Sequence, residues 1–157
     1  MSDISKIDSN FKVETNIKEK DIKFYNANQA PFEIFGVFYD NGKYRRMPEN
    51  VAKTVNEGVY GLHTNTAGGR VRFKTDSRYV AINTKMFSIG KMPHFALTGS
   101  SGFDLYVCDE TENYVSTFTP PFNIQDGYES IIYFSSSKMR EITINFPLYS
   151  GVCELYI

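Results

Sequence analysis

The feature of this sequence that most constrains its fold is the alternation of apolar and polar residues in short segments. In RVRFKT, residues 70–75, Val71 and Phe73 alternate with basic side chains. The segment REITINF, residues 140–146, repeats the pattern with two isoleucines and a phenylalanine. Successive side chains of a β-strand point to opposite faces of its sheet. Each segment is therefore predicted to be a strand with one buried face.

Turn signals separate these segments along the whole chain. Asn41 and Gly42 stand between two strand-like runs, and both tolerate the positive φ of a two-residue hairpin turn. The one helical candidate covers residues 48–56, where proline suits the first helical turn. The sequence thus predicts an all-β fold, an antiparallel β-sandwich that is jelly-roll-like and has at most one short helix.

Length and composition indicate a single globular domain. With 157 residues, 41% hydrophobic and 22% charged, the chain can bury a core. We expect residues 1–20 to form a polar N-terminal arm and residues 21–157 the sandwich. A net charge of −1 speaks against nucleic-acid binding. Neither a signal peptide nor an apolar run long enough for a membrane helix is apparent, so we expect no membrane association and a cytoplasmic location.

The sequence offers no metal or cofactor motif. Cys108 and Cys153 lie far apart between apolar residues and are predicted to be two half-buried free thiols in strands. The acidic segment CDETEN, residues 108–113, lacks the spacing of a calcium loop and is predicted to be a solvated hairpin turn. We therefore expect no metal ion and no cofactor.

The segment TGSSGFD, residues 98–104, superficially resembles a catalytic serine loop. A nucleophile elbow requires G-x-S-x-G between a strand and a helix, and around Ser101 the second glycine stands one position too early. A strand-like run follows in place of a helix. We expect Gly99 and Gly102 to supply positive φ in a tight loop, with Ser100 and Ser101 bonded to local backbone.

The same segment carries a resemblance to a known family. Residues 102–106 read GFDLY and match the G-x-D-L-Y signature, which is named after the N-terminal domain of a group of SGNH (GDSL-type) hydrolases. Residues 45–82, 92–106 and 140–157 also resemble this family, in the expected order. The resemblance implies a β-sandwich that precedes an α/β hydrolase domain, which holds the serine nucleophile and is expected downstream of this chain.

The resemblance implies a non-catalytic role for the chain itself, as an accessory domain that packs on the hydrolase domain and helps to shape its active site. The full-length parent would be a serine esterase that removes acyl groups such as acetyl. We expect no catalytic residue here, and we expect Asp104 to anchor its loop by accepting backbone N–H bonds. The candidate binding or domain-interface residues are Asn65, His94, Ser100, Ser101 and Asp104, and the candidate structural-loop residues are Gly99, Gly102 and Tyr106.

Two other classes of function stay open at this point. A stand-alone carbohydrate-binding β-sandwich is compatible with the many Tyr and Phe residues, although the absence of Trp removes the strongest stacking side chain. The substrate would then be a carbohydrate and not an ester. A purely structural or dimer-forming module is the third class, and the sequence does not specify the oligomeric state.

Overall fold

Ten β-strands and three short α-helices make up the part of the chain that the computed structural model describes, residues 13–108 and 111–157. The strands are β1 (Glu33–Phe35), β2 (Phe38–Asp40), β3 (Lys43–Arg45), β4 (Arg70–Thr75), β5 (Tyr79–Ser88), β6 (Phe103–Cys108), β7 (Glu112–Phe118), β8 (Gly127–Tyr133), β9 (Arg140–Asn145) and β10 (Gly151–Tyr156). The helices are α1 (Glu49–Val55), α2 (Glu57–Leu62) and α3 (Leu97–Ser101).

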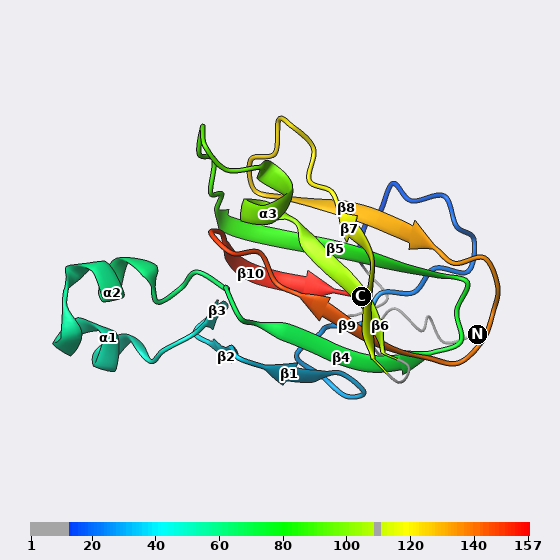
Figure 1. Ribbon diagram of the computed structural model, residues 1–157, viewed down its shortest axis with the longest axis horizontal. Coiled ribbons are helices and arrows are strands. Elements are labelled where there is room, and N and C mark those ends of the chain that lie inside the picture. Colours follow the sequence, from blue (N-terminus) through cyan, green and yellow to red (C-terminus); the bar gives the residue numbers. More distant parts are fainter. Residues whose placement is uncertain (1–12, 109–110) are drawn as a thin grey trace, which may run out of the picture.

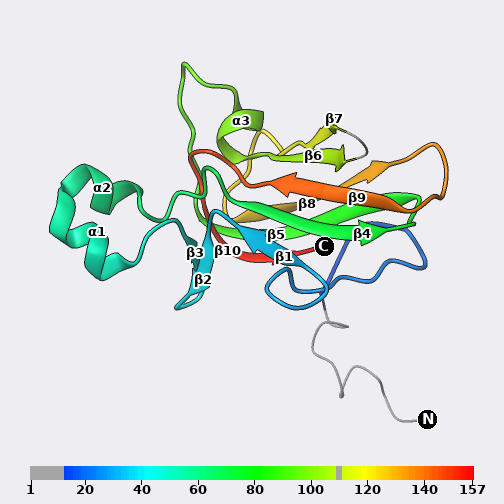
Figure 2. The same cartoon turned by 60° about the horizontal axis from the view of Figure 1, so that its bottom comes forward.

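The strands form two main sheets that face each other (Figures 1 and 2). One sheet has five strands in the order β1-β4-β9-β6-β7, and the other has three in the order β10-β5-β8. A separate hairpin joins β2 to β3. Every pair of neighbouring strands is antiparallel. The predicted antiparallel β-sandwich is confirmed, while its jelly-roll character stays a prediction.

The alternating segments build the core between the two sheets. Val71 of β4 pairs with Ile144 of β9, and both side chains are fully buried, as is Ile142. Thr143 was expected on the polar face, and it is fully buried as well. It sits in the middle strand of the five, where its neighbours across the strands are Arg72 and Tyr106. Long side chains on both sides therefore cover a short one.

The prediction of at most one short helix was wrong, since the structure has three. The expected helix after Pro48 is α1. Helix α2 follows at once because the Asn56 side chain accepts a hydrogen bond of 2.9 Å from the backbone N–H of Val59 and caps it. Helix α3 is a single turn around Gly99, too short and too rich in Gly and Ser to show helical periodicity.

Several local predictions are confirmed. Asn41 and Gly42 have φ of 47° and 74° in the turn between β2 and β3, as a type I′ hairpin requires. Cys108 and Cys153 are both free, half-buried and in strands. Of the predicted acidic turn, residues 109–110 lie outside the described part of the chain.

The predicted N-terminal arm is described only from residue 13 onward. In that part, the carboxylate of Glu129 on β8 accepts bonds from the Thr15 hydroxyl (2.6 Å) and the Asn16 backbone N–H (2.7 Å). Tyr133, also on β8, donates to the Glu19 carboxylate at 2.8 Å. These residues therefore lie against the three-stranded sheet. Within the described ranges, none of the helices has the length and apolar character needed to cross a membrane.

Candidate domain-interface site

Helix α3 places Ser100 and Ser101 inside the protein. Both side chains are 0% exposed. The Ser101 hydroxyl lies 2.9 Å from the Ser150 hydroxyl, just before β10, and the Ser100 hydroxyl donates to the carbonyl of Leu97 at 3.3 Å. Among the described residues, neither serine hydroxyl bonds to a histidine or a carboxylate. Both serines are therefore buried residues whose hydroxyls bond to other groups of the protein.

Ser150 is the centre of this arrangement. Its hydroxyl donates to the backbone carbonyl of Ser100 at 2.9 Å and accepts from the backbone N–H of Gly90 at 3.1 Å. Because a hydroxyl has one proton, the bond between Ser150 and Ser101 must be donated by Ser101. The Ser101 proton is thus committed to another serine. Three chain segments are joined through a single oxygen atom.

The Asn65 loop meets α3 at the same end of the sandwich. Thr66, fully buried, donates from its hydroxyl to the carbonyls of Pro147 at 2.9 Å and Ser150 at 3.2 Å. The backbone N–H of Tyr149 bonds to the carbonyl of Ser100 at 3.1 Å. The turn of residues 147–150 therefore bridges the two loops that carry Asn65 and Ser100. Asn65 itself is half-buried beside this bridge.

The structure corrects the expected role of the two glycines. Gly102 has φ of −82°, and neither Gly102 nor Gly99 is among the residues with positive φ. What Gly102 provides is space, because a Cβ there would lie 2.3 Å from the carbonyl oxygen of Thr98. At Gly99 a Cβ would lie 2.7 Å from the ring of Phe95. Both glycines allow close approach, which the sequence pattern alone does not distinguish from a positive φ.

Asp104 and Tyr106 of the G-x-D-L-Y segment lie on β6 and not in a loop. The Asp104 carboxylate accepts a bond of 2.5 Å from the hydroxyl of Thr117 on β7 and not the backbone N–H bonds that were expected. The ring of Tyr106 meets that of Tyr114 edge-on, with 5.6 Å between centroids. Both residues are half-buried on the outer face of the five-stranded sheet.

His94 is exposed in the loop before α3, apart from the buried serines. Apolar side chains surround this loop, and we call them the α3 patch: Met92, Phe95, Leu97, Phe122, Leu148 and Tyr149. Four of them, Met92, Phe95, Leu97 and Phe122, line one shallow pocket, and the ring of Phe95 meets that of Tyr149 edge-on at 5.4 Å. Phe122 is 93% exposed. Contiguous exposed apolar side chains are typical of interaction surfaces, whereas single ones are common on any protein.

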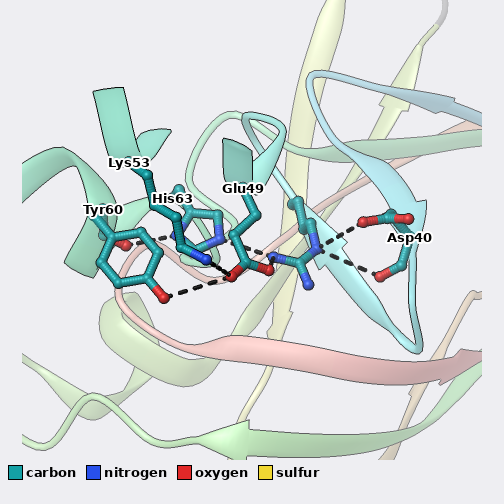
Figure 3. A network of polar contacts seen from close by, with 6 residues as sticks. Asp40, Glu49, Lys53, Tyr60 and His63 are labelled. Atoms are coloured by element: carbon teal, nitrogen blue, oxygen red, sulfur yellow. Dashed lines mark hydrogen bonds and ion pairs between the residues drawn. The ribbon is translucent and has the colours of Figure 1, made fainter. Parts of the chain in front are cut away.

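Helices α1 and α2 project beyond the sheets on the side where β2 and β3 lie (Figures 1 and 2). A buried arginine, Arg45 at the end of β3, attaches them. Its guanidinium lies 3.2 Å from the Asp40 carboxylate, 3.6 Å from that of Glu49 on α1 and 2.8 Å from Nε2 of His63 (Figure 3). This charged network connects the β2–β3 hairpin to α1 and α2, which we call the helical arm.

Hydrogen bonding fixes the tautomer of His63. Its Nδ1 lies 2.5 Å from the carbonyl oxygen of Tyr60, which can only accept, so Nδ1 carries the proton and Nε2 accepts from Arg45. Lys53 bonds to Glu49 at 2.7 Å and lowers the pKa of that carboxyl below its usual value. Nε2 of His63 therefore accepts a structural hydrogen bond. Among the described residues, no hydrogen bond joins His63 to Ser100 or Ser101.

The sequence predictions did not include this network. The signal that could have revealed it is the spacing of Arg45, Glu49 and Lys53, each four residues from the next, because side chains four apart on a helix are neighbours. Because Arg45 lies in β3, before the first residue of α1, the spacing cannot be recognised as helical from the sequence. As for metals, no three His, Cys, Asp or Glu side chains are arranged to hold an ion in residues 13–108 and 111–157.

The family model that matches the chain is GxDLY, the N-terminus of the SGNH hydrolase-type esterase, and it matches residues 22–157. The chain belongs to this family. The GxDLY domain thus includes both sheets, the helical arm and α3. No curated protein matches the sequence at a significant level.

Several solved structures resemble the GxDLY domain in fold, and two of them illustrate the likeness. One is a Bacteroides ovatus protein described as a GDSL-like lipase, with 20% identity, a TM-score of 0.73 and coverage of 85% of this chain. Another is the salicylyl-acyltransferase SsfX3 from a tetracycline biosynthetic pathway, with 16% identity, a TM-score of 0.61 and coverage of 86% of this chain. The chain spans 39% of the length of each of these proteins. At these identities the likeness concerns the fold alone.

Proposed function

We propose that this GxDLY domain is a non-catalytic accessory domain that packs on an SGNH-type hydrolase domain in the same polypeptide and helps to shape its active site. The hydrolase domain carries the serine nucleophile and removes an acyl group, acetyl or another short one, from its substrate. The family assignment supports this, because the matching model describes the N-terminal part of such esterases.

One observation carries the proposal: buried serines and exposed apolar side chains occur at the same end of the sandwich. The hydroxyl of Ser101 is 0% exposed and bonded to Ser150, so it is not presented to a substrate. The α3 patch beside it is exposed and apolar, with Phe122 and Tyr149 at its surface. A free surface of this kind gains stability when another domain covers it.

In this proposal the α3 patch contacts the hydrolase domain, and His94 and Asn65 lie near the mouth of its ester pocket. His94 is exposed, and its side chain makes no hydrogen bond or ion pair within the described residues, so it is available to a neighbouring domain. Helices α1 and α2 lie at the same end of the sandwich as α3 (Figure 1), and their exposed apolar side chains include Val55 and Leu62. In this proposal they extend the contact.

The first experiment compares this chain with its full-length parent in the hydrolysis of p-nitrophenyl acetate. The parent should hydrolyse the ester, while this chain and its Ser101→Ala variant should both remain at the background rate. Hydrolysis by this chain above background that Ser101→Ala abolishes would show that the chain is itself catalytic. The reading frame that follows codon 157 provides a second check, since it should encode a serine nucleophile motif.

The second experiment tests the α3 patch in the parent. Phe122→Ala should lower kcat/KM about tenfold, because the ring would no longer hold the two domains in register. The matched control is Tyr133→Ala, a 59% exposed aromatic residue at the far end of β8. Equal kcat/KM for the two variants would contradict the assignment of the patch as the domain contact.

A further inference from the structure

The outer face of the five-stranded sheet carries a row of polar side chains that is not explained by the contact between domains. Arg70 of β4 pairs with Asn145 of β9, Asn145 pairs with Asp104 of β6, and Asp104 pairs with Thr117 of β7. Paired residues of antiparallel strands point to the same face, so these four side chains stand in one line. The ends of the line are three strand spacings apart, a distance of about 14 Å.

Most hydrogen-bonding groups in this row have no partner among the residues that the structure describes. The side chains of Arg70 and Asn145 make no hydrogen bond or ion pair in the described parts of the chain, although both are half-buried. Among the described side chains, the carboxylate of Asp104 accepts only the hydroxyl of Thr117, which lies 2.9 Å from the hydroxyl of Tyr114. The hydroxyl of Tyr106, in the next row, has no bonded partner among the described residues. These groups are held in place by the sheet and are free to bind a ligand.

Aromatic rings stand beside the polar row. Tyr106 and Tyr114 pair across β6 and β7, with their rings edge-on, and Tyr114 is 57% exposed. On the other side of the face, the exposed ring of Phe35 lies 5.5 Å from the guanidinium of Arg72, whose Nε is buried without a partner within the described residues. The guanidinium of Arg72 also forms an ion pair with Glu112 at 3.9 Å. The face thus combines exposed rings with the planar side chains of Arg70 and Asn145, which have no partner in the described part of the chain.

We infer that this face binds a polysaccharide chain through what we call the sheet-face site, which consists of Arg70, Asn145, Asp104, Tyr106 and Tyr114. Neighbouring sugar hydroxyls both donate and accept, so they match a guanidinium, an amide and a carboxylate that can each make two parallel bonds. The C–H face of a sugar ring is apolar and packs on an aromatic ring such as Tyr114. The length of the row fits an oligosaccharide better than a single sugar.

The charges on the face favour a neutral ligand over an anionic one. Arg70 and Arg72 share the surface with the carboxylates of Asp104, Glu112 and Glu141, so no basic stripe is formed. Nucleic acid binding depends on such a stripe. The sheet-face site does not rest on the proposed accessory function, because it lies on a sheet face and not on the α3 patch.

Native affinity electrophoresis tests the inference, with gels that contain soluble xylan, mixed-linkage β-glucan, galactomannan or pectin. The chain should be retarded in at least one gel. Arg70→Ala and Tyr114→Ala should each lower the association constant about tenfold or more. The matched control Phe122→Ala removes an exposed ring outside the site and should leave retardation unchanged. Because Arg70 has no partner within the described residues, its variant should unfold at the same temperature as the wild type.

Arg70→Lys provides a second test that does not depend on truncating the side chain. It keeps the charge but removes the two parallel donors, so retardation should fall if the guanidinium binds sugar. The inference is overturned if none of the four gels retards the chain, or if the Arg70 and Tyr114 variants are retarded like the wild type. It is also overturned if hydrogen exchange in the full-length parent shows β6 and β7 covered by the hydrolase domain.

Discussion

The Ser101 hydroxyl donates a hydrogen bond of 2.9 Å to the Ser150 hydroxyl, across 49 positions of sequence. Ser150 in turn donates to the carbonyl of Ser100 and accepts from the backbone N–H of Gly90. The serine pair that superficially resembles a catalytic motif therefore holds three chain segments together beneath α3. The Ser101 hydroxyl and the Ser100 carbonyl are both used in this arrangement, while the Ser100 hydroxyl donates to the carbonyl of Leu97.

Ser150→Ala should destabilise the fold more than Ser101→Ala. The first change leaves the half-buried N–H of Gly90 without an acceptor, and leaves the Ser101 hydroxyl only its 3.5 Å contact with Ser100, which costs about 1–3 kcal/mol of the free energy of unfolding. The second leaves Ser150 with two of its three bonds, so a loss of about 1 kcal/mol is expected. Urea unfolding followed by tyrosine fluorescence measures both. An equal or larger loss for Ser101→Ala would contradict the central position of Ser150.

Gly102→Ala should be destabilising even though its backbone suits any residue. The new Cβ would lie 2.3 Å from the carbonyl oxygen of Thr98 and 2.9 Å from the side chain of Thr117. Such overpacking costs about 1–3 kcal/mol. The matched control is Gly61→Ala in α2, where nothing lies within 4 Å of the new atom. That variant should gain about 0.5 kcal/mol, because alanine favours helix. Thermal unfolding should therefore show shifts of opposite sign.

Arg45→Met should loosen the helical arm from the sandwich. Arg45 is only 6% exposed and binds Asp40, Glu49 and His63, so its removal leaves an unpaired acceptor on His63. The expected loss is about 2 kcal/mol, since both carboxylates are partly solvated. Hydrogen exchange of the α1 and α2 amides should become faster, while that of β9 should change little.

A surface variant provides the control for Arg45. Lys53→Met removes the exposed ion pair with Glu49 but leaves Arg45 in place. Its effect on the free energy of unfolding should be much smaller than that of Arg45→Met, because the exposed pair is screened by solvent. If the two variants destabilise the protein equally, the buried guanidinium does not have the special role that we assign to it.

Stability should fall at alkaline pH because tyrosines are buried. The Tyr128 hydroxyl donates to the carbonyl of Phe118 at 2.7 Å, and burial raises the pKa of Tyr128 well above its usual value. In the unfolded chain the group ionises near pH 10. Its stabilising contribution is therefore complete below about pH 10 and is lost as the pH rises further, by about 1.4 kcal/mol per pH unit. Burial also raises the pKa of Tyr44, so this residue adds to the loss of stability at alkaline pH.

The slope of stability against pH isolates the contribution of Tyr128. Tyr128→Phe should be less stable than the wild type at neutral pH, because two carbonyls lose a donor. Above pH 10 its stability should fall less steeply, by about 1.4 kcal/mol per pH unit. Urea unfolding at several pH values measures both slopes. Parallel slopes would mean that Tyr128 ionises freely in the folded protein.

Much of the fold could be predicted from local sequence pattern. The alternation around Val71 and Ile144 indicated buried strand faces, and Asn41-Gly42 indicated the hairpin between β2 and β3. These features depend on residues close in sequence, where side-chain periodicity and backbone preference act directly. The G-x-D-L-Y segment pointed to the family for the same reason, since it is a contiguous motif.

The candidate site could be predicted only in part. The sequence indicated that Ser100 and Ser101 were not a nucleophile elbow, but it gave no reason to pair Ser101 with Ser150. The sequence likewise did not predict the close contacts of Gly99 and Gly102, the α3 turn or the partners of Arg45. Each depends on groups that are far apart along the chain or that satisfy one another only after the sheets have packed.

By itself, the sequence determined the strand pattern, the class of fold and the family, because these follow from periodicity and contiguous motifs. Only the tertiary structure decided what the polar residues do. It buried Ser101 against Ser150 and placed Asp104 in line with Arg70 across three strands. Hydrogen bonds between distant segments form where strand pairing brings donors and acceptors together, and strand order is a property of the whole fold.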